Sequence, residues 1–157
     1  MRSATIGNMQ TTGPTPRLLT DQEIQELLAA DIPARLATID RDGSPRITPI
    51  WFLWENGAFY MSSVKGKIQL RNLERNPVAS ICVDVEEPDS GTGHRPNRQI
   101  KAKAAVRLFE DDGSWTRRIT AKYVSGPEGE RTAAERASKP RLVIELRPSR
   151  IIGLAAC

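Results

Sequence analysis

The spacing of apolar residues along the chain predicts four helical segments. The first begins at Thr20, where the sequence TDQE is a capping box, and Ile24, Leu27 and Leu28 follow at helical spacing. Pro33 marks its end, because the residue before a proline is disfavoured in the helical conformation. The same periodicity predicts further helices at 67–75, at 115–124 with Ser114 as its N-cap, and at 131–138.

Apolar runs with a period of two predict the strands. Arg98–Glu110 is the clearest, because apolar side chains face one way whereas Lys101, Lys103 and Arg107 face the other. The segment Pro45–Glu55 is apolar on both faces, so we expect the domain's own core to cover one face and a second subunit to cover the other. Shorter strands are expected at 34–40, 58–63, 78–85, 142–146 and 151–154.

Turn residues separate these strands and limit the fold class. Asp40–Gly43 and Asn56-Gly57 are turn sequences, and Pro49 marks an edge or a local break because it donates no ladder hydrogen bond. Helices and strands do not alternate regularly enough for a doubly wound parallel sheet. We therefore predict an α+β fold, mainly β, in which about six antiparallel strands form a small barrel with flanking helices.

The chain of 157 residues fits one domain. Residues 1–16 are rich in Thr, Gly, Pro and Ser, so we expect a flexible N-terminal arm ahead of one folded domain at 17–157. No apolar run approaches the ~20 residues of a membrane-spanning helix. The first residues also lack the apolar stretch of a signal peptide, so a cytoplasmic location is the expectation.

The composition limits the classes of ligand and catalytic site that the chain can have, but it does not identify a ligand. The formal net charge of +4 favours anionic partners, from a single phosphate to a nucleic acid. Cys82 and Cys157 are far apart and lack metal-site spacing, so we expect neither a disulfide framework nor a metal site. The single histidine, His94, lies in a polar loop at 86–97, where a solvated side chain is expected. Without a nucleophile, a metal set or paired carboxylates, catalysis would depend on a bound cofactor.

A strand-to-helix turn is the first candidate site for such a cofactor. Ser62, Ser63, Lys65, Gly66 and Lys67 surround this turn. Hydroxyls, ammonium groups and the exposed amides of a helix N-terminus favour a phosphate, and a glycine lets the backbone approach it closely. On spacing alone, a solvated basic turn explains the same residues and is the more common case.

The strand segment Arg46-Ile47-Thr48-Pro49 is the second candidate. The guanidinium could hold a phosphate or a ring carbonyl, and backbone groups freed near Pro49 could bond the edge of a heteroaromatic ring. An ordinary strand with an exposed arginine is the alternative. The basic ladder of Arg98–Arg107 is a third candidate, for nucleic acid, but it lacks the stacking aromatics of single-strand binders, so a solvated or subunit-facing strand is preferred.

Five stretches follow one another in a distinctive order over roughly Leu18 to Leu154: RLATIDRDGSPRITPIWFLWENGAFYMSS, KGKIQLRNLERNPVASICVD, RQIKAKAAVRLFEDD, WTRRITAKYV and RLVIELRPSRIIG. This pattern resembles the pyridoxamine 5′-phosphate oxidase-like split-barrel family, which includes flavin- and deazaflavin-dependent oxidoreductases. The resemblance implies a six-stranded FMN-binding split barrel and an intimate homodimer. It also implies two equivalent interface sites, each holding FMN or the deazaflavin coenzyme F420.

The resemblance further implies which residues contact the cofactor. Arg46–Ile50 match the strand that lines the ring system, and Ser62 and Ser63 match the strand end beside the ribityl chain. Many relatives have a lysine at the position of Gln69, so the phosphate contacts are expected to move to Lys65 and Lys67. The implied cofactor-binding set is Arg46, Ile47, Thr48, Pro49, Ile50, Ser62, Ser63, Lys65, Gly66, Lys67 and Gln69.

The expected function is that of a dimeric FMN-dependent oxidoreductase which transfers hydride to or from a small organic substrate. A deazaflavin (F420)-dependent reductase of the same fold is the first alternative, and a non-catalytic cofactor- or haem-binding module is the second. The oxidase's own pyridoxal-site signature is not matched near the C-terminus, so pyridoxamine phosphate oxidation itself is disfavoured. The sequence assigns neither a catalytic side chain nor a substrate.

Overall fold

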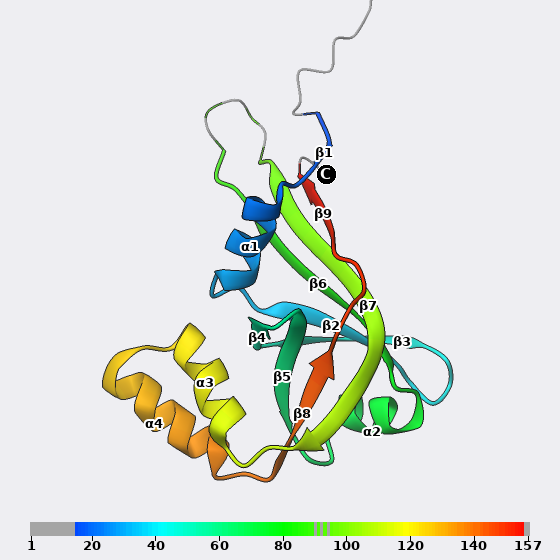
Figure 1. The fold of residues 1–157 in the computed structure, drawn as a ribbon, viewed down its shortest axis with the longest axis vertical. Helices are drawn as coiled ribbons and strands as arrows, with labels where there is room; N and C mark the ends of the chain where they lie inside the picture. Colours follow the sequence, from blue (N-terminus) through cyan, green and yellow to red (C-terminus); the bar gives the residue numbers. More distant parts are fainter. Residues whose placement is uncertain (1–14, 90, 92, 94, 156–157) are drawn as a thin grey trace, which may run out of the picture.

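One antiparallel sheet contains the nine strands in the described part of this computed structural model, residues 15–89, 91, 93 and 95–155 (Figure 1). The strands are β1 Arg17–Leu18, β2 Ala34–Ile39, β3 Pro45–Ile50, β4 Phe52–Glu55, β5 Ala58–Val64, β6 Val78–Glu86, β7 Asn97–Glu110, β8 Arg141–Leu146 and β9 Ile152–Ala155. The helices are α1 Asp21–Ala29, α2 Ile68–Arg75, α3 Ser114–Tyr123 and α4 Gly126–Ala137. The path through the sheet is β3-β2-β6-β7-β8-β5-β4, with β9 joined to β7 and β1 joined to β9.

The long strand β7 belongs to both halves of this sheet. Its first part pairs with β6 and β9, and its last part, from Val106 to Glu110, pairs with β8. In Figure 1, α1 covers the half that contains β6, whereas α3 lies beside β5 at the other end and α4 packs against α3. The regular alternation of apolar and basic residues that predicted β7 allows one face to be buried along the strand's first half, at Ile100 and Ala102.

The prediction of an α+β, mainly β, antiparallel fold is confirmed, but the predicted count of six strands is wrong. The predicted strand Pro45–Glu55 divides at Trp51 into β3 and β4, which lie at opposite ends of the sheet path. The backbone N–H of Phe52 donates to the hydroxyl of Tyr123 (3.1 Å), so a side chain takes up this donor where the strand divides. The other addition is β1, whose two residues are too short to produce a periodic signal.

Helix ends follow local side-chain chemistry, and two of the predicted ends were wrong. The capping box at Thr20 is confirmed, because its hydroxyl and the carboxylate of Glu23 bond each other's backbone amides. Ser114 is not the N-cap of α3; Gly113 takes that position, and the carboxylates of the two preceding aspartates accept hydrogen bonds from the first turn. Helix α4 starts at Gly126 instead of residue 131.

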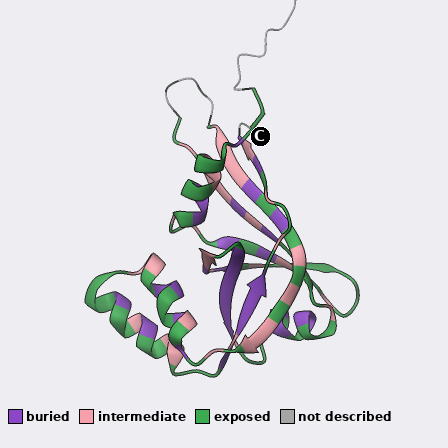
Figure 2. Ribbon diagram, viewed as in Figure 1, coloured by how far each residue is buried: buried purple, intermediate pink, exposed green. Residues whose placement is uncertain are grey.

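The buried core concentrates on β5, where every residue from Ala58 to Ser63 is buried, as the purple strand in Figure 2 shows. Phe52 and Phe59 lie in the same core as Leu27 and Leu28 of α1. Burial of side chains of this size contributes roughly 1.5–3 kcal/mol each. Because β5 is the rigid centre of the fold, its last buried residues, Ser62 and Ser63, are held in fixed positions.

Two sequence predictions lie wholly or mostly outside the described residues. Residues 1–14 of the predicted arm and His94 of the predicted loop are among those not described. No helix in the described ranges is long and apolar enough to cross a membrane.

Candidate functional site

A pocket of about 320 Å³ opens where the end of β5 meets β3 and the first turn of α2. Its lining comes from segments that are far apart in the sequence. They contribute Pro33, Thr48, Pro49, Ile50, Trp51, Ser62, Ser63, Val64, Lys67, Gln69, Arg136 and Arg141.

Two buried serines at the end of β5 form part of the pocket wall, and each has a different partner. Ser63 Oγ accepts a hydrogen bond from Gln69 Nε2 (2.9 Å), so its own hydroxyl hydrogen remains for a ligand. Ser62 Oγ accepts from Arg141 Nε (2.8 Å) and lies 2.6 Å from the hydroxyl oxygen of Thr116. These contacts connect α2, α3 and β8 through β5.

Arg141 is a nearly buried cation, with 8% of its surface exposed. Besides its bond to Ser62 Oγ, it donates from Nη2 to the Ser62 carbonyl oxygen (3.0 Å). Burial lowers the pKa of Arg141, the like charge of Arg136 lowers it further, and the carboxylate of Asp111 acts in the opposite direction. The pocket therefore contains a fixed positive charge that its own partners neutralise only in part.

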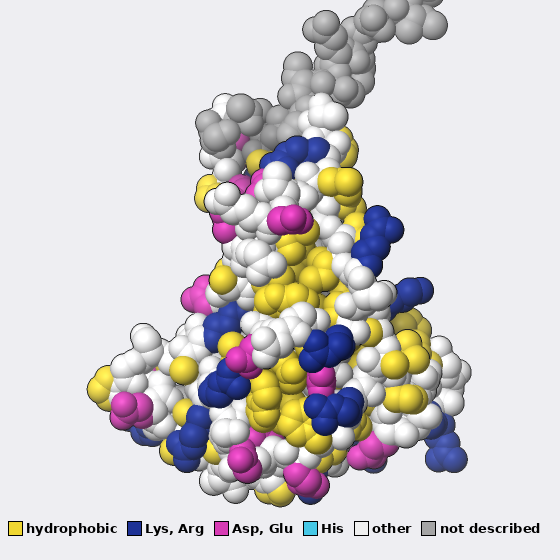
Figure 3. Space-filling model, in the orientation of Figure 1, with side chains coloured by type: hydrophobic (Ala, Val, Ile, Leu, Met, Phe, Trp, Pro, Cys, Tyr) yellow, Lys and Arg dark blue, Asp and Glu magenta, His cyan; other side chains and the backbone are white. Residues whose placement is uncertain are grey.

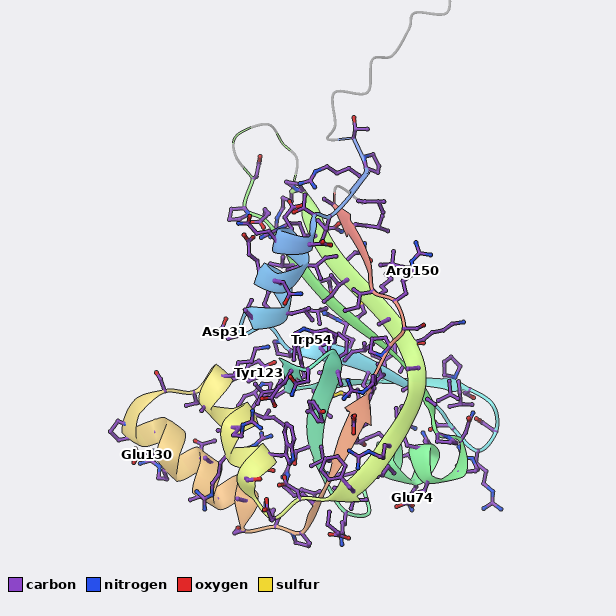
Figure 4. All side chains as sticks on the ribbon, in the orientation of Figure 1. Asp31, Trp54, Glu74, Tyr123, Glu130 and Arg150 are labelled. Carbon is purple, nitrogen blue, oxygen red and sulfur yellow. The ribbon has the colours of Figure 1, made fainter. Side chains whose placement is uncertain are left out.

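Arg136 of α4 lies over an aromatic residue of the pocket lining. Its guanidinium carbon is 4.5 Å from the centre of the Trp51 ring, and Trp51 stacks on Tyr123 with the ring centres 4.7 Å apart. Burial lowers the pKa of Arg136 and raises the pKa of Tyr123 to about 12. Figure 4 shows Tyr123 extending from α3 toward the strands, where its hydroxyl accepts from the Phe52 amide.

The first turn of α2 adds a third cation. Lys67 is the exposed N-cap residue of this helix, and no side chain caps the turn, so backbone amides at the start of α2 are open to an anion. Lys67, Arg136 and Arg141 line the pocket, whereas no Asp or Glu among the described residues does. The arrangement is chemically suited to an oxyanion, and phosphate is the commonest oxyanion of cofactors.

A family model described as pyridoxamine 5′-phosphate oxidase matches residues 20–155, a range that spans α1 to β9. The chain belongs to the pyridoxamine 5′-phosphate oxidase family. No curated protein sequence matches it.

Three solved structures with this fold carry different names. An F420 reductase shares 22% sequence identity, covering 81% of this chain and 94% of the other, with a TM-score of 0.60. An FAD-binding protein from Mesorhizobium loti shares 21% (90% and 99% covered, TM-score 0.61). HutZ, the haem storage protein from Vibrio cholerae, also shares 21% (83% and 92% covered, TM-score 0.60). At these identities the likeness establishes the fold alone, and the three names show that this fold serves different ligands.

The structure brings seven of the eleven predicted site residues of this family member into the pocket. They are Thr48, Pro49, Ile50, Ser62, Ser63, Lys67 and Gln69. Their contact with a cofactor stays a prediction.

The other four predicted residues lie outside the pocket lining. Lys65 forms an ion pair with Glu110 (2.6 Å), and Arg46 forms one with Asp40 (2.8 Å). Gly66 takes a positive φ of 84°, which the turn before α2 requires, and no atom lies near the position of an added Cβ. Ile47 lines a second hollow.

Sequence reasoning did not select Trp51, Arg136 or Arg141 for this site. Arg141 starts β8 immediately after Pro140, and nothing local distinguishes it from other basic residues at strand ends. Arg136 lies in α4, whose beginning the glycine at 126 concealed. Only the folded chain shows that these residues share one pocket.

The second hollow is an apolar groove of about 660 Å³ across β2, β3, β6, β7 and the start of β9. Ile47, which is 66% exposed, and Ile152 line it together with Lys101, Lys103 and Arg150. Figure 4 shows Arg150 projecting outward just before β9. Figure 3 shows hydrophobic side chains gathered down the middle of one face of the molecule, with Lys and Arg beside them. Of the predicted strand Pro45–Glu55, the described groove lining contains Ile47, and the cover of one face of this strand by a second subunit stays a prediction.

The predicted basic ladder of β7 is partly neutralised. Arg98 pairs with Glu87 (2.7 Å), and Arg107 pairs with Glu145. Lys101 and Lys103 remain at the groove. The interpretation of this ladder as a subunit-facing strand instead of a nucleic-acid track stays a prediction.

Proposed function

We propose that the protein is a homodimeric flavin-type oxidoreductase that binds FMN in the pocket and transfers hydride to or from a small organic substrate. The observation that carries the proposal is the pocket's charge, because its described lining contains three cations and no carboxylate. A terminal phosphate dianion is the group that such a set favours. The family to which the chain belongs supports a cofactor of this class.

The residues present fit FMN. Lys67, the Ser63 hydroxyl and the open amides of α2 would hold the phosphate. Strand β3 is the first strand of the sheet path, so its outer backbone groups, from Arg46 to Ile50, are available to the edge of a ring. Ile50 is buried and Trp51 half-buried, which limits the access of water to this wall.

FMN would supply the hydride chemistry when bound. The side chains would bind and orient the cofactor. Positive charge beside the ring would also stabilise the reduced, anionic form.

A second copy of the chain is the proposed cover of the apolar groove. Ile47 and Ile152 expose large apolar side chains there, and contiguous exposed apolar surface usually marks an interface. The basic residues at the groove, Lys101, Lys103 and Arg150, would lie at the rim of such an interface, where charged side chains are commonly found.

The test is identification of the ligand that co-purifies with the protein. Release by denaturation followed by mass spectrometry is expected to give FMN, and the native protein is expected to absorb in the flavin bands and to be bleached by a nicotinamide donor. A colourless protein that takes up neither FMN nor F420 on titration would exclude the proposal.

F420 is the alternative cofactor, because its phosphate and acidic tail would also suit three cations in an open pocket. Recovery of F420, or bleaching only by a deazaflavin donor, would select it. Bound cofactor or haem without reduction by any donor would instead indicate a non-catalytic binding module.

A further inference from the structure

Arg136 and Arg141 differ from most other arginines of the described chain, because neither forms an ion pair with a described carboxylate. Nine other described arginines have such partners, as in the pairs Arg98–Glu87 and Arg118–Glu55, whereas most of the remainder are exposed to solvent. The two guanidinium groups nevertheless line the same pocket, and the charge of Arg136 acts to lower the pKa of Arg141. Two like charges gathered in one partly buried site are unfavourable unless an anion lies between or beside them.

Arg136 shows most directly that a partner is missing. Its Nε is buried and has no hydrogen-bond partner, which is true of no other buried side-chain N or O atom in the described residues. An unpaired buried donor is costly, and more so on a charged group. Arg141 uses Nε and Nη2 on Ser62, so its Nη1 also remains for a ligand.

The position of Arg136 is fixed by stacking. The guanidinium lies over the Trp51 ring, Trp51 stacks on Tyr123, and the Tyr123 hydroxyl accepts a hydrogen bond from the Phe52 amide. A planar guanidinium stacked on an indole loses little further freedom when it binds, so its fork of N–H donors is prepared for an oxyanion.

We propose that Arg136 and Arg141, which belong to α4 and β8, form an oxyanion-binding subsite in the pocket that Lys67 also lines, and that this subsite takes a phosphate or carboxylate group. The proposal deepens the proposed function and rests on it for the identity of the molecule that carries the oxyanion. That molecule is either the cofactor, through its phosphate, or an acidic substrate beside the cofactor. The described carboxylate of Asp111 acts on the charge of Arg141, but it accepts hydrogen bonds from Ser62 and Thr116 and forms no ion pair with either guanidinium group.

The test compares Arg136→Gln with Arg131→Gln, a control on the same helix whose side chain is exposed and paired with Glu128. Affinities of each protein for FMN and for riboflavin, which lacks the phosphate, are measured by fluorescence titration. If the subsite holds the cofactor phosphate, Arg136→Gln weakens the affinity for FMN about 10- to 100-fold, because one charge-assisted contact is lost. The affinity of this variant for riboflavin is unchanged. Arg136→Lys, which keeps the charge without the fork, is expected to be intermediate.

A second arm detects an acidic substrate. Inorganic phosphate is titrated into the FMN-loaded proteins, and the thermal midpoint is recorded. Unchanged FMN affinity, with phosphate stabilisation present in wild type and Arg131→Gln but lost in Arg136→Gln, supports the substrate source.

The two proposals fail in different ways. If Arg136→Gln changes neither the FMN-to-riboflavin ratio nor the response to phosphate, the subsite is disproved while the proposed function stands. If the wild type binds neither FMN nor F420, but inorganic phosphate stabilises the wild type and does not stabilise Arg136→Gln, the subsite stands and the proposed function fails.

Discussion

The pocket and the groove of this molecule are opposites in chemistry. The pocket, about 320 Å³, places buried serines and three cations around a small space, whereas the groove, about 660 Å³, exposes Ile47 and Ile152 between basic side chains. Fixed and incompletely paired charge suits a small anion. An open apolar surface suits another protein surface. The two hollows share strand β3, which contributes Thr48, Pro49 and Ile50 to the pocket and Ile47 to the groove, so the proposed cofactor site lies next to the proposed subunit contact.

The largest effect is expected from a charge placed in the groove. Ile47→Asp would bury an unpaired carboxylate in the proposed interface, and we expect the dimer dissociation constant to rise at least ~100-fold. Sedimentation velocity over a range of concentrations measures this. Val78→Asp is the matched control, because Val78 is 49% exposed but does not line the groove. A wild-type monomer, or equal effects of the two variants, would contradict the assignment of the groove.

Two serine substitutions test whether the pocket wall contributes more to the free energy of unfolding than the groove wall. Ser62→Ala in the pocket removes the acceptor of Arg141 Nε and the partner of Thr116, so the free energy of unfolding should fall by about 2 kcal/mol. Ser80→Ala on the exposed wall of the groove should change it by less than about 0.5 kcal/mol. Urea denaturation gives both values, and similar losses for the two variants would show that the Ser62 contacts add no special stability.

Two lysines of the same turn test which cations serve the ligand. Lys67 lines the pocket, whereas Lys65 is paired with Glu110. We expect Lys67→Ala to weaken FMN binding about 10-fold and Lys65→Ala to weaken it less than about 3-fold. Isothermal titration with FMN measures both constants. An equal loss of affinity in the two variants would instead support the sequence-based prediction that both Lys65 and Lys67 contact the phosphate.

The last prediction concerns the pH dependence of stability and Lys122, whose ammonium lies 3.6 Å from the centre of the Phe52 ring. Burial lowers the pKa of Lys122 to about 8, from 10.5, while the charge of Asp31 opposes the shift. Between these values the unfolded chain binds more protons, so the Lys122 contribution to stability rises as pH rises from about 8 to 10.5.

Lys122→Met removes this titration. The difference in free energy of unfolding between wild type and variant should therefore shift in favour of wild type between pH 7.5 and pH 10. The raised pKa of Tyr123 acts in both proteins and cancels from the difference. A difference that stays constant with pH would show that Lys122 titrates normally.

Local signals predicted much of the fold. The TDQE capping box, the Asn56-Gly57 turn and the alternation of β7 each depend on neighbouring residues, and all three are confirmed. Helix α4 was placed late because Gly126 and Gly129 resemble a break. Gly129 is required inside the helix because an added Cβ would lie 2.3 Å from the Val124 carbonyl oxygen.

The candidate site was predictable only where its residues are neighbours in sequence. Ser62, Ser63 and Lys67 lie within one strand-to-helix connection, so spacing alone suggested that they act together. Glu110, the partner that occupies Lys65, is 45 residues away from it. Arg136 and Arg141 reach the pocket through tertiary packing, which no local pattern encodes.

Titration of the wild-type protein with FMN and with riboflavin tests the central claim most directly. The two molecules differ only in the phosphate, so their affinity ratio measures what the cationic pocket contributes. We expect FMN to bind at least ~30-fold more tightly, because two or more charged contacts to the phosphate are formed. Equal affinities, or no binding of either molecule, would contradict the assignment of this pocket as the anchor of a flavin phosphate.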